Sequence, residues 1–148
     1  MKTLTRYVCV SVGMLLGASG FARADDHGNH CTLQTLRGTY VFSASGFNIV
    51  AGVSQPKAIV EVIDFNGDGT LSVPAATRSI NGVVARSAPG GMGTYTVADD
   101  CTGTIDFNGP TYDIFISHDR EAIWMIQTNP NTVFQGTAAR SAGGRDRN

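Results

Sequence analysis

Helical periodicity is missing from this sequence. No segment repeats apolar residues every three or four positions over several turns, so we expect little helix. A second long apolar run is also missing after residue 24, which predicts no stable insertion into a membrane. The glycine-rich stretch 90–93 opens a predicted strand instead of a helix, so it is not a nucleotide-binding loop.

Cysteine is scarce: the sequence has three, at positions 9, 31 and 101, and no Cys-x-x-Cys motif. Cys9 lies within an N-terminal apolar run that we expect to be removed. In an exported protein the simplest use of Cys31 and Cys101 is one disulfide, which would stabilise the fold by roughly 4 kcal/mol on the chain-entropy model. The alternative is a pair of reactive or metal-binding thiols, although no second cluster of ligands accompanies them.

The first 24 residues have the pattern of a secretory signal peptide. Lys2 and Arg6 precede the apolar run 8–21, and Ala22-Arg23-Ala24 fits the small-x-small cleavage rule. The alternative is a membrane anchor, but the run is shorter than the roughly 20 residues that a span needs. We therefore predict cleavage after Ala24 and export to the periplasm or the exterior.

Basic residues are also few once the predicted signal peptide, residues 1–24, is removed. Three of the eleven basic residues and none of the twelve acidic ones precede residue 25, so the mature chain carries eight basic and twelve acidic residues, a net charge of −4. This balance argues against nucleic acid, or an anionic membrane, as a partner. The remaining 124 residues are enough for one domain.

What the sequence does have is a recurring Gly-Thr pair. The pair stands before an apolar or aromatic residue five times, beginning at Gly38, Gly69, Gly93, Gly103 and Gly136. Glycine suits turns and bulges, and threonine is a good strand former that tolerates water. The pattern therefore predicts short antiparallel strands.

Eight strands follow from these pairs and the turns between them. They are predicted at 39–45, 58–65, 70–73 (bulged at Pro74 and resuming to Ile80), 92–97, 102–107, 112–117, 122–128 and 132–139. Short links make neighbours antiparallel. We predict an all-β fold, a single antiparallel up-and-down barrel of about eight strands, with a β-sandwich as the alternative.

The domain plan follows directly from this strand pattern. Residues 25–36 form an N-terminal leader, 37–140 the barrel and 141–148 a disordered tail. Two longer loops, 46–56 and 83–91, are expected at the rims of the barrel, where function often resides.

Several of these motifs resemble known families. The Gly-Thr-Tyr start, the Asp-Cys-Thr-Gly-Thr element at 100–104, and the closing Ile-Gln-Thr (126–128) and Thr-Val-x-x-Gly (132–136) are similar to a group of small exported bacterial β-barrel proteins of undescribed function. More distantly, strand order and length resemble the calycin-like barrel of allene oxide cyclases and dirigent proteins. That likeness implies a cavity for hydrophobic molecules, but it transfers no catalytic residue.

Two segments resemble metal sites. Residues 64–71 have oxygen side chains and a glycine where a calcium loop begins, but Ala75 stands where a bidentate acid is needed, so a hairpin turn explains them as well. After cleavage, the amino terminus at Asp25 with His27 in third place, assisted by His30, has donors for square-planar Cu(II) or Ni(II). The alternative is a polar leader without metal, and no other cofactor is expected.

Acids within strands are the other chemical candidates. Glu61 shares a face with Ile59 and Ile63, so it is either an interior carboxylate with a raised pKa, able to act as acid or base, or a solvating exterior charge. The rarity of unpaired buried charge favours the exterior. Asp113, between Tyr112 and Ile114, can likewise face either the interior or the exterior. The adjacent residues 117–119, Ser-His-Asp, lie on a turn and cannot converge as a triad.

Aromatic residues and architecture leave three functional classes open. Tyr40, Phe42, Tyr112 and Trp124 are candidates for a ligand cage, but core packing is the favoured role. The leading hypothesis is an exported barrel that binds a small apolar ligand. The alternatives are a cyclase or isomerase that uses Glu61 and a structural or surface-interaction protein with a solid core. A non-enzymatic role is favoured, and the oligomeric state is left open.

Overall fold

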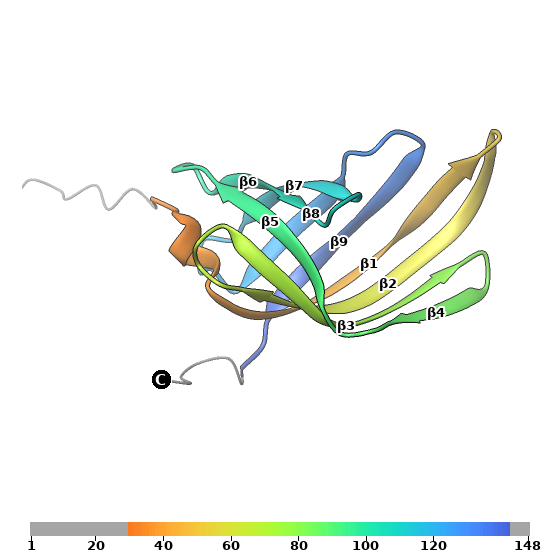
Figure 1. Ribbon diagram of the computed structural model, residues 1–148. Coiled ribbons are helices and arrows are strands. Elements are labelled where there is room, and N and C mark those ends of the chain that lie inside the picture. Colours follow the sequence, from red (N-terminus) through yellow and green to blue (C-terminus); the bar gives the residue numbers. More distant parts are fainter. Residues whose placement is uncertain (1–29, 143–148) are drawn as a thin grey trace, which may run out of the picture.

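Antiparallel strands make up most of the structure, a computed structural model that describes residues 30–142 (Figure 1). A closed barrel of eight strands is joined by one extra strand, which confirms the predicted fold class. A short 3₁₀ helix, η1 (Leu33–Leu36), precedes the strands. The strands are β1 (Gly38–Val50), β2 (Val53–Phe65), β3 (Thr70–Ile80), β4 (Val83–Ser87), β5 (Gly91–Val97), β6 (Thr102–Asp106), β7 (Thr111–Ile116), β8 (Ala122–Gln127) and β9 (Thr132–Arg140).

The barrel closes because β1 pairs with both β2 and β9, and β2 also pairs with β3. The extra strand β4 continues the line of β5: both pair with β3, β4 from Ile80 to Ala76 and β5 from Val73 to Thr70. The short β6 pairs with β5 but not with β4. The ring of hydrogen-bonded strands is therefore complete at one end of the barrel. At the other end it is interrupted, because within residues 30–142 β4 has no strand paired to its second edge.

Two predicted rim loops are wrong in detail. Most of segment 46–56 belongs to the β1–β2 hairpin, which turns only at Ala51-Gly52, and segment 83–91 contains strand β4. Gly46 was expected to end a strand. Instead it lies inside β1, where a Cβ atom would lie 1.9 Å from the carbonyl oxygen of Val133. A glycine in a strand can thus mark a close approach of two backbones, not a turn.

A β-bulge at Pro74 confirms the predicted irregularity in β3. Asp64 pairs with Ser72, whereas Val62 pairs with Ala75, so Val73 and Pro74 together face Ile63. Proline has no N–H to donate, and a bulge is where a strand tolerates that loss. The extra residue switches the inward side of β3 from odd to even positions.

Three of the Gly-Thr pairs have a common structural role. Gly93, Gly103 and Gly136 occupy inward positions of their strands, and a Cβ atom at these residues would lie 2.0–2.4 Å from a carbonyl oxygen of a neighbouring strand. The threonine that follows each of them points outward and is exposed. The absence of a side chain thus lets the sheet bend sharply into a barrel.

Adding one methyl group at such a corner is expected to destabilise the barrel. Gly136→Ala brings a Cβ atom within 2.2 Å of the Ser43 carbonyl oxygen, and overpacking of this kind costs about 1–3 kcal/mol. Urea unfolding measures the loss. Gly91→Ala is the matched control, because its nearest contact is 3.3 Å from the Val73 side chain. Equal losses in the two variants would contradict the corner role of Gly136.

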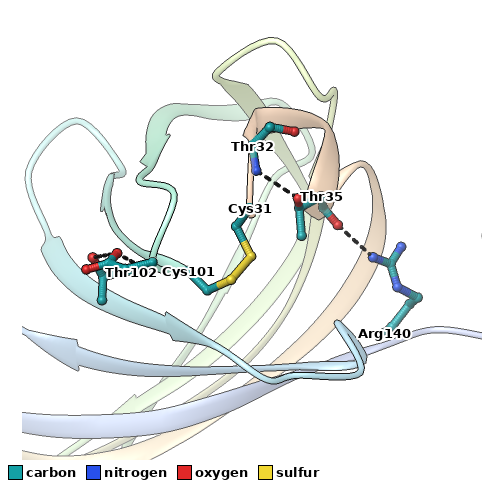
Figure 2. The surroundings of a disulfide bond; sticks show 7 residues. Cys31, Thr32, Thr35, Cys101, Thr102 and Arg140 are labelled. Atoms are coloured by element: carbon teal, nitrogen blue, oxygen red, sulfur yellow. Dashed lines mark hydrogen bonds between the residues drawn. A yellow bond between two sulfur atoms is a disulfide. The ribbon is translucent and has the colours of Figure 1, made fainter. Parts of the chain in front are cut away.

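One end of the barrel, here called the closed end, is covered by η1. The disulfide between Cys31 and Cys101 ties this helix to the β5–β6 turn, with a Cα–Cα distance of 5.0 Å (Figure 2). The Tyr95 hydroxyl donates to the Leu33 carbonyl at 2.9 Å, and Arg140 donates to the Thr35 carbonyl at 3.1 Å. These bonds fasten the helix to three separate parts of the sheet.

Side chains fill the barrel from the closed end to about its middle. Tyr40, Phe65 and Tyr95 meet in edge-to-face contacts, with ring centroids 4.9–5.4 Å apart. The fully buried side chains are Cys31, Leu36, Tyr40, Phe42, Ile63, Leu71, Ile105, Ile114, Ile123, Met125 and Phe134. This half of the barrel is a solid core.

Other predictions fall at the edges of the described chain. The predicted signal peptide and residues 143–148 of the predicted tail lie outside it. Ser141, the first residue of that tail, donates a backbone hydrogen bond to Thr39 at 2.9 Å. Within residues 30–142, no helix has the length and apolar character to cross a bilayer.

Candidate functional site

The opposite end of the barrel, here called the open end, contains a cavity of about 410 Å³. The β1–β2 and β3–β4 hairpins extend past β5, β6 and β7 on this side (Figure 1). Two aromatic contacts border the cavity, Phe42 with Tyr112 at 5.9 Å and Phe107 with Tyr112 at 5.7 Å. The lining is mostly apolar and comprises Lys57, Ile59, Glu61, Val73, Ala76, Arg78, Ile80, Ser87, Ala88, Gly91, Met92, Phe107, Pro110 and Tyr112.

Three charged side chains lie on the wall of this cavity. Lys57 and Glu61 come from β2, where they share the inward face with Ile59. Arg78 comes from the part of β3 that follows the bulge at Pro74. The bulge turns the even positions of this part, Arg78 among them, toward the interior. Two basic groups and one acid thus line an otherwise apolar space.

Lys57 is held in place by its neighbours. Its Nζ lies 4.1 Å from the centre of the Phe134 ring and donates a hydrogen bond to Gln127 Oε1 at 3.0 Å. Gln127 in turn donates to Asn129 Oδ1 at 2.9 Å. Burial and the charge of Arg78 lower the pKa of the Lys57 ammonium, while the charge of Glu61 opposes this. An ammonium has three donors, so Lys57 can still bind a polar group of a ligand.

Glu61 points into the barrel, contrary to the exterior position that the sequence favoured. Its side chain is buried, with 8% relative exposure, and no group of residues 30–142 donates a hydrogen bond to its carboxylate. Burial raises the pKa of the Glu61 carboxyl to about 7, although the Lys57 charge acts in the opposite direction. The group can therefore take up or release a proton near neutral pH.

The four aromatic candidates, for which core packing was favoured over a ligand cage, do not gather into a cage. Tyr40 lies toward the closed end, where its hydroxyl donates to the Arg120 carbonyl at 3.2 Å and burial raises its pKa to about 12. Phe42 is buried at the border of the cavity. Trp124, expected in the core, is 52% exposed on the outer wall beside Phe115, its cross-strand partner. Burial and the Glu61 charge raise the pKa of the Tyr112 hydroxyl.

The calcium-like segment forms a hairpin turn. The Asp68 carboxylate accepts hydrogen bonds from both the backbone N–H and the hydroxyl of Thr70, at 3.0 and 2.6 Å. These bonds lower the pKa of Asp68 and direct its oxygen at the chain itself. Residues 30–142 contain no group of three or more His, Cys, Asp or Glu side chains placed to hold a metal. The proposed copper or nickel donors, Asp25 and His27, lie outside these residues.

Ser117, His118 and Asp119 form the turn between β7 and β8. The Ser117 hydroxyl donates to the Asp119 carboxylate at 2.5 Å, and the backbone N–H of Glu121 donates to the same oxygen at 3.1 Å. These local bonds cap a turn and leave no converging triad. Asp113, the other strand acid, is exposed on the outer wall.

Sequence reasoning missed the two basic residues of the cavity. Lys57 was detectable, because it stands two positions before Ile59 on the face that also carries Glu61 and Ile63. Arg78 was not, because alternation from Leu71 and Val73 would place it outside. Only the paired register of β2 and β3 shows that the bulge reverses its direction.

A larger hollow, of about 550 Å³, lies on the outer wall. Outward residues line most of it, among them Ser43, Ser45, Val60 and Thr77, so it is a trough on the sheet surface and not a cavity of the interior. We therefore take the smaller cavity at the open end as the candidate site. No protein-family model, curated protein or solved structure matches the chain.

Proposed function

We propose that this protein binds a small, largely apolar molecule in the cavity at its open end. The observation that supports this most is an interior space of about 410 Å³, with apolar walls and a few charged groups. This size and composition are typical of small-molecule sites, which span roughly 300–1,000 Å³. The solid half of the barrel supplies a rigid base, and Lys57 and Arg78 supply polar contacts.

Filling the cavity tests this proposal. Farnesol and palmitate serve as apolar probes in a thermal-shift assay, because a ligand at about 100 times its Kd adds about 2.7 kcal/mol of stability. Ala76 lines the cavity beside Glu61, its partner on the neighbouring strand, so Ala76→Leu is expected to fill the space and abolish the shift. Ala88→Leu, at an exposed position of the lining, serves if the first variant fails to fold.

Ala58→Leu is the matched control, because Ala58 is exposed on the outward face of β2. It is expected to leave the thermal shift unchanged. The wild type should show a higher unfolding temperature with at least one of these probes or with a member of a wider panel of lipids and terpenoid alcohols. If none of them shifts the unfolding temperature, the binding proposal is wrong.

A second candidate, an acid–base isomerase or cyclase, is favoured by one observation. Glu61 is buried in the cavity wall, and burial brings its pKa to about 7, close to the value that suits proton transfer at neutral pH. In that case Glu61→Gln removes turnover of a bound substrate while binding persists. If the protein only binds its ligand, the ligand stays chemically unchanged both in the wild type and in Glu61→Gln.

A further inference from the structure

Charge is unevenly distributed along the barrel axis. The extended parts of the two hairpins, residues 44–60 and 76–88, contain three basic residues, Lys57, Arg78 and Arg86, and no acid. The turns at the closed end are acidic on balance, with Asp68, Asp99, Asp100, Asp119 and Glu121 against one arginine, Arg120. The net charge of −4 expected for the mature chain therefore does not describe the open end.

The tips of the same hairpins are apolar and exposed. Val53, at the β1–β2 turn, is 63% exposed, and Val83, at the β3–β4 turn, is 73% exposed. Residues 46–55 and 79–85 contain no charged side chain at all. Exposed apolar groups gathered at one end of a protein mark a contact with something apolar.

Both faces of each tip carry exposed apolar side chains. Val50 and Val53 take inward positions of the β1–β2 hairpin, whereas Phe47 takes an outward position beside Val133 of β9. On the other hairpin Val83 is inward and Val84 is outward. A partner protein resting on one face would leave the other face in water. A lipid bilayer surrounds a tip and covers both.

We propose that the open end is a peripheral membrane-docking surface, in which the two hairpin tips enter the interfacial layer of a bilayer that carries anionic headgroups. The basic side chains stand behind the tips, at the depth where headgroup phosphates would lie. The barrel itself stays outside the bilayer. Val53 and Val83 share the inward faces of β2 and β4 with the cavity side of the two hairpins, and Val83 pairs with Ile80 of the cavity lining. An apolar molecule would therefore pass from the bilayer to the cavity along these inward faces.

Vesicle flotation tests the docking surface, using the mature chain and vesicles of phosphatidylcholine with or without phosphatidylglycerol. The wild type is expected to float with the anionic vesicles, and less so as salt increases. Val53→Asp and Val83→Asp are each expected to weaken binding about tenfold or more, because a carboxylate is costly in an apolar layer. Arg86→Ala is expected to weaken it about fivefold on the anionic vesicles.

Val41→Asp is the matched control. Val41 is an exposed valine of β1, the strand that pairs with β2, but it lies near the closed end. It should bind vesicles like the wild type, and circular dichroism checks that every variant is folded. Absence of flotation with either vesicle, or an equal loss in Val41→Asp, would overturn the proposal. So would self-association that Val53→Asp abolishes in a chain that binds no vesicle, since a second copy would then cover the tips.

This docking surface does not depend on the proposed ligand. The cavity-filling variant Ala76→Leu leaves both tips unchanged and is expected to bind vesicles like the wild type. Loss of ligand binding with intact flotation therefore tells against the cavity alone. Loss of flotation with an intact thermal shift tells against the docking surface alone.

Discussion

Replacing both cysteines, as Cys31→Ala with Cys101→Ser, is expected to lower the free energy of unfolding by about 4 kcal/mol. The bond joins residues 70 positions apart, so it removes a large amount of conformational freedom from the unfolded chain. Alanine suits position 31 because the site is buried. Urea unfolding measures the loss, and the unfolding temperature should fall by on the order of 15 °C.

Wild-type protein in reducing buffer controls for changes in packing, because it loses the bond while it keeps both sulfur atoms. It should lose nearly as much stability as the double variant. A loss below about 1 kcal/mol in both samples would show that η1 stays docked without the bond, held by the Tyr95 and Arg140 hydrogen bonds.

Glu61→Gln is expected to stabilise the protein, and to do so in a pH-dependent way. Burial raises the pKa of Glu61 from 4.5 to about 7 in the folded protein, so between these values the unfolded chain loses a proton that the folded chain keeps. Wild-type stability therefore falls as pH rises through this window. Above pH 7 the folded protein bears the full cost of the buried charge, on the order of 3 kcal/mol.

A neutral glutamine does not bear this cost. The gain in unfolding free energy from Glu61→Gln should be largest above pH 7 and should shrink toward zero below about pH 4.5. Urea unfolding at a series of pH values measures the difference. Asp113→Asn, a carboxyl-to-amide change on the outer wall, is the matched control. A gain from Glu61→Gln that is constant with pH would mean that the Glu61 carboxyl is not the group responsible.

The number and direction of the strands were predictable because turn chemistry is local. Asn66–Gly69 forms the expected hairpin turn, and Asp68 and Thr70 fix it with hydrogen bonds between near neighbours. The disulfide was predictable from cysteine scarcity. The hairpin extensions were not, because Gly46 and Pro56 are turn-forming residues elsewhere, whereas here they serve a close backbone contact and a strand.

The candidate site was only half predictable. Alternation placed Glu61 correctly beside Ile59 and Ile63, but the rule against unpaired buried charge suggested the wrong face. That rule fails here because Lys57 lies on the same face and the cavity opens at the end of the barrel. Whether a cavity exists at all depends on how far each strand extends past its neighbours, which short-range sequence patterns do not encode.

The bulge at Pro74 decides which side chains of β3 reach the cavity. With regular alternation from Leu71 and Val73, Thr77 and Ser79 would point inward and Arg78 outward, so the site would have hydroxyls in place of a fixed positive charge. Insertion or loss of a single residue there would convert one set of wall chemistries into the other while the barrel kept its strand order. Variation in ligand preference among barrels of this shape can therefore arise from residue count, without any change in which amino acids are present.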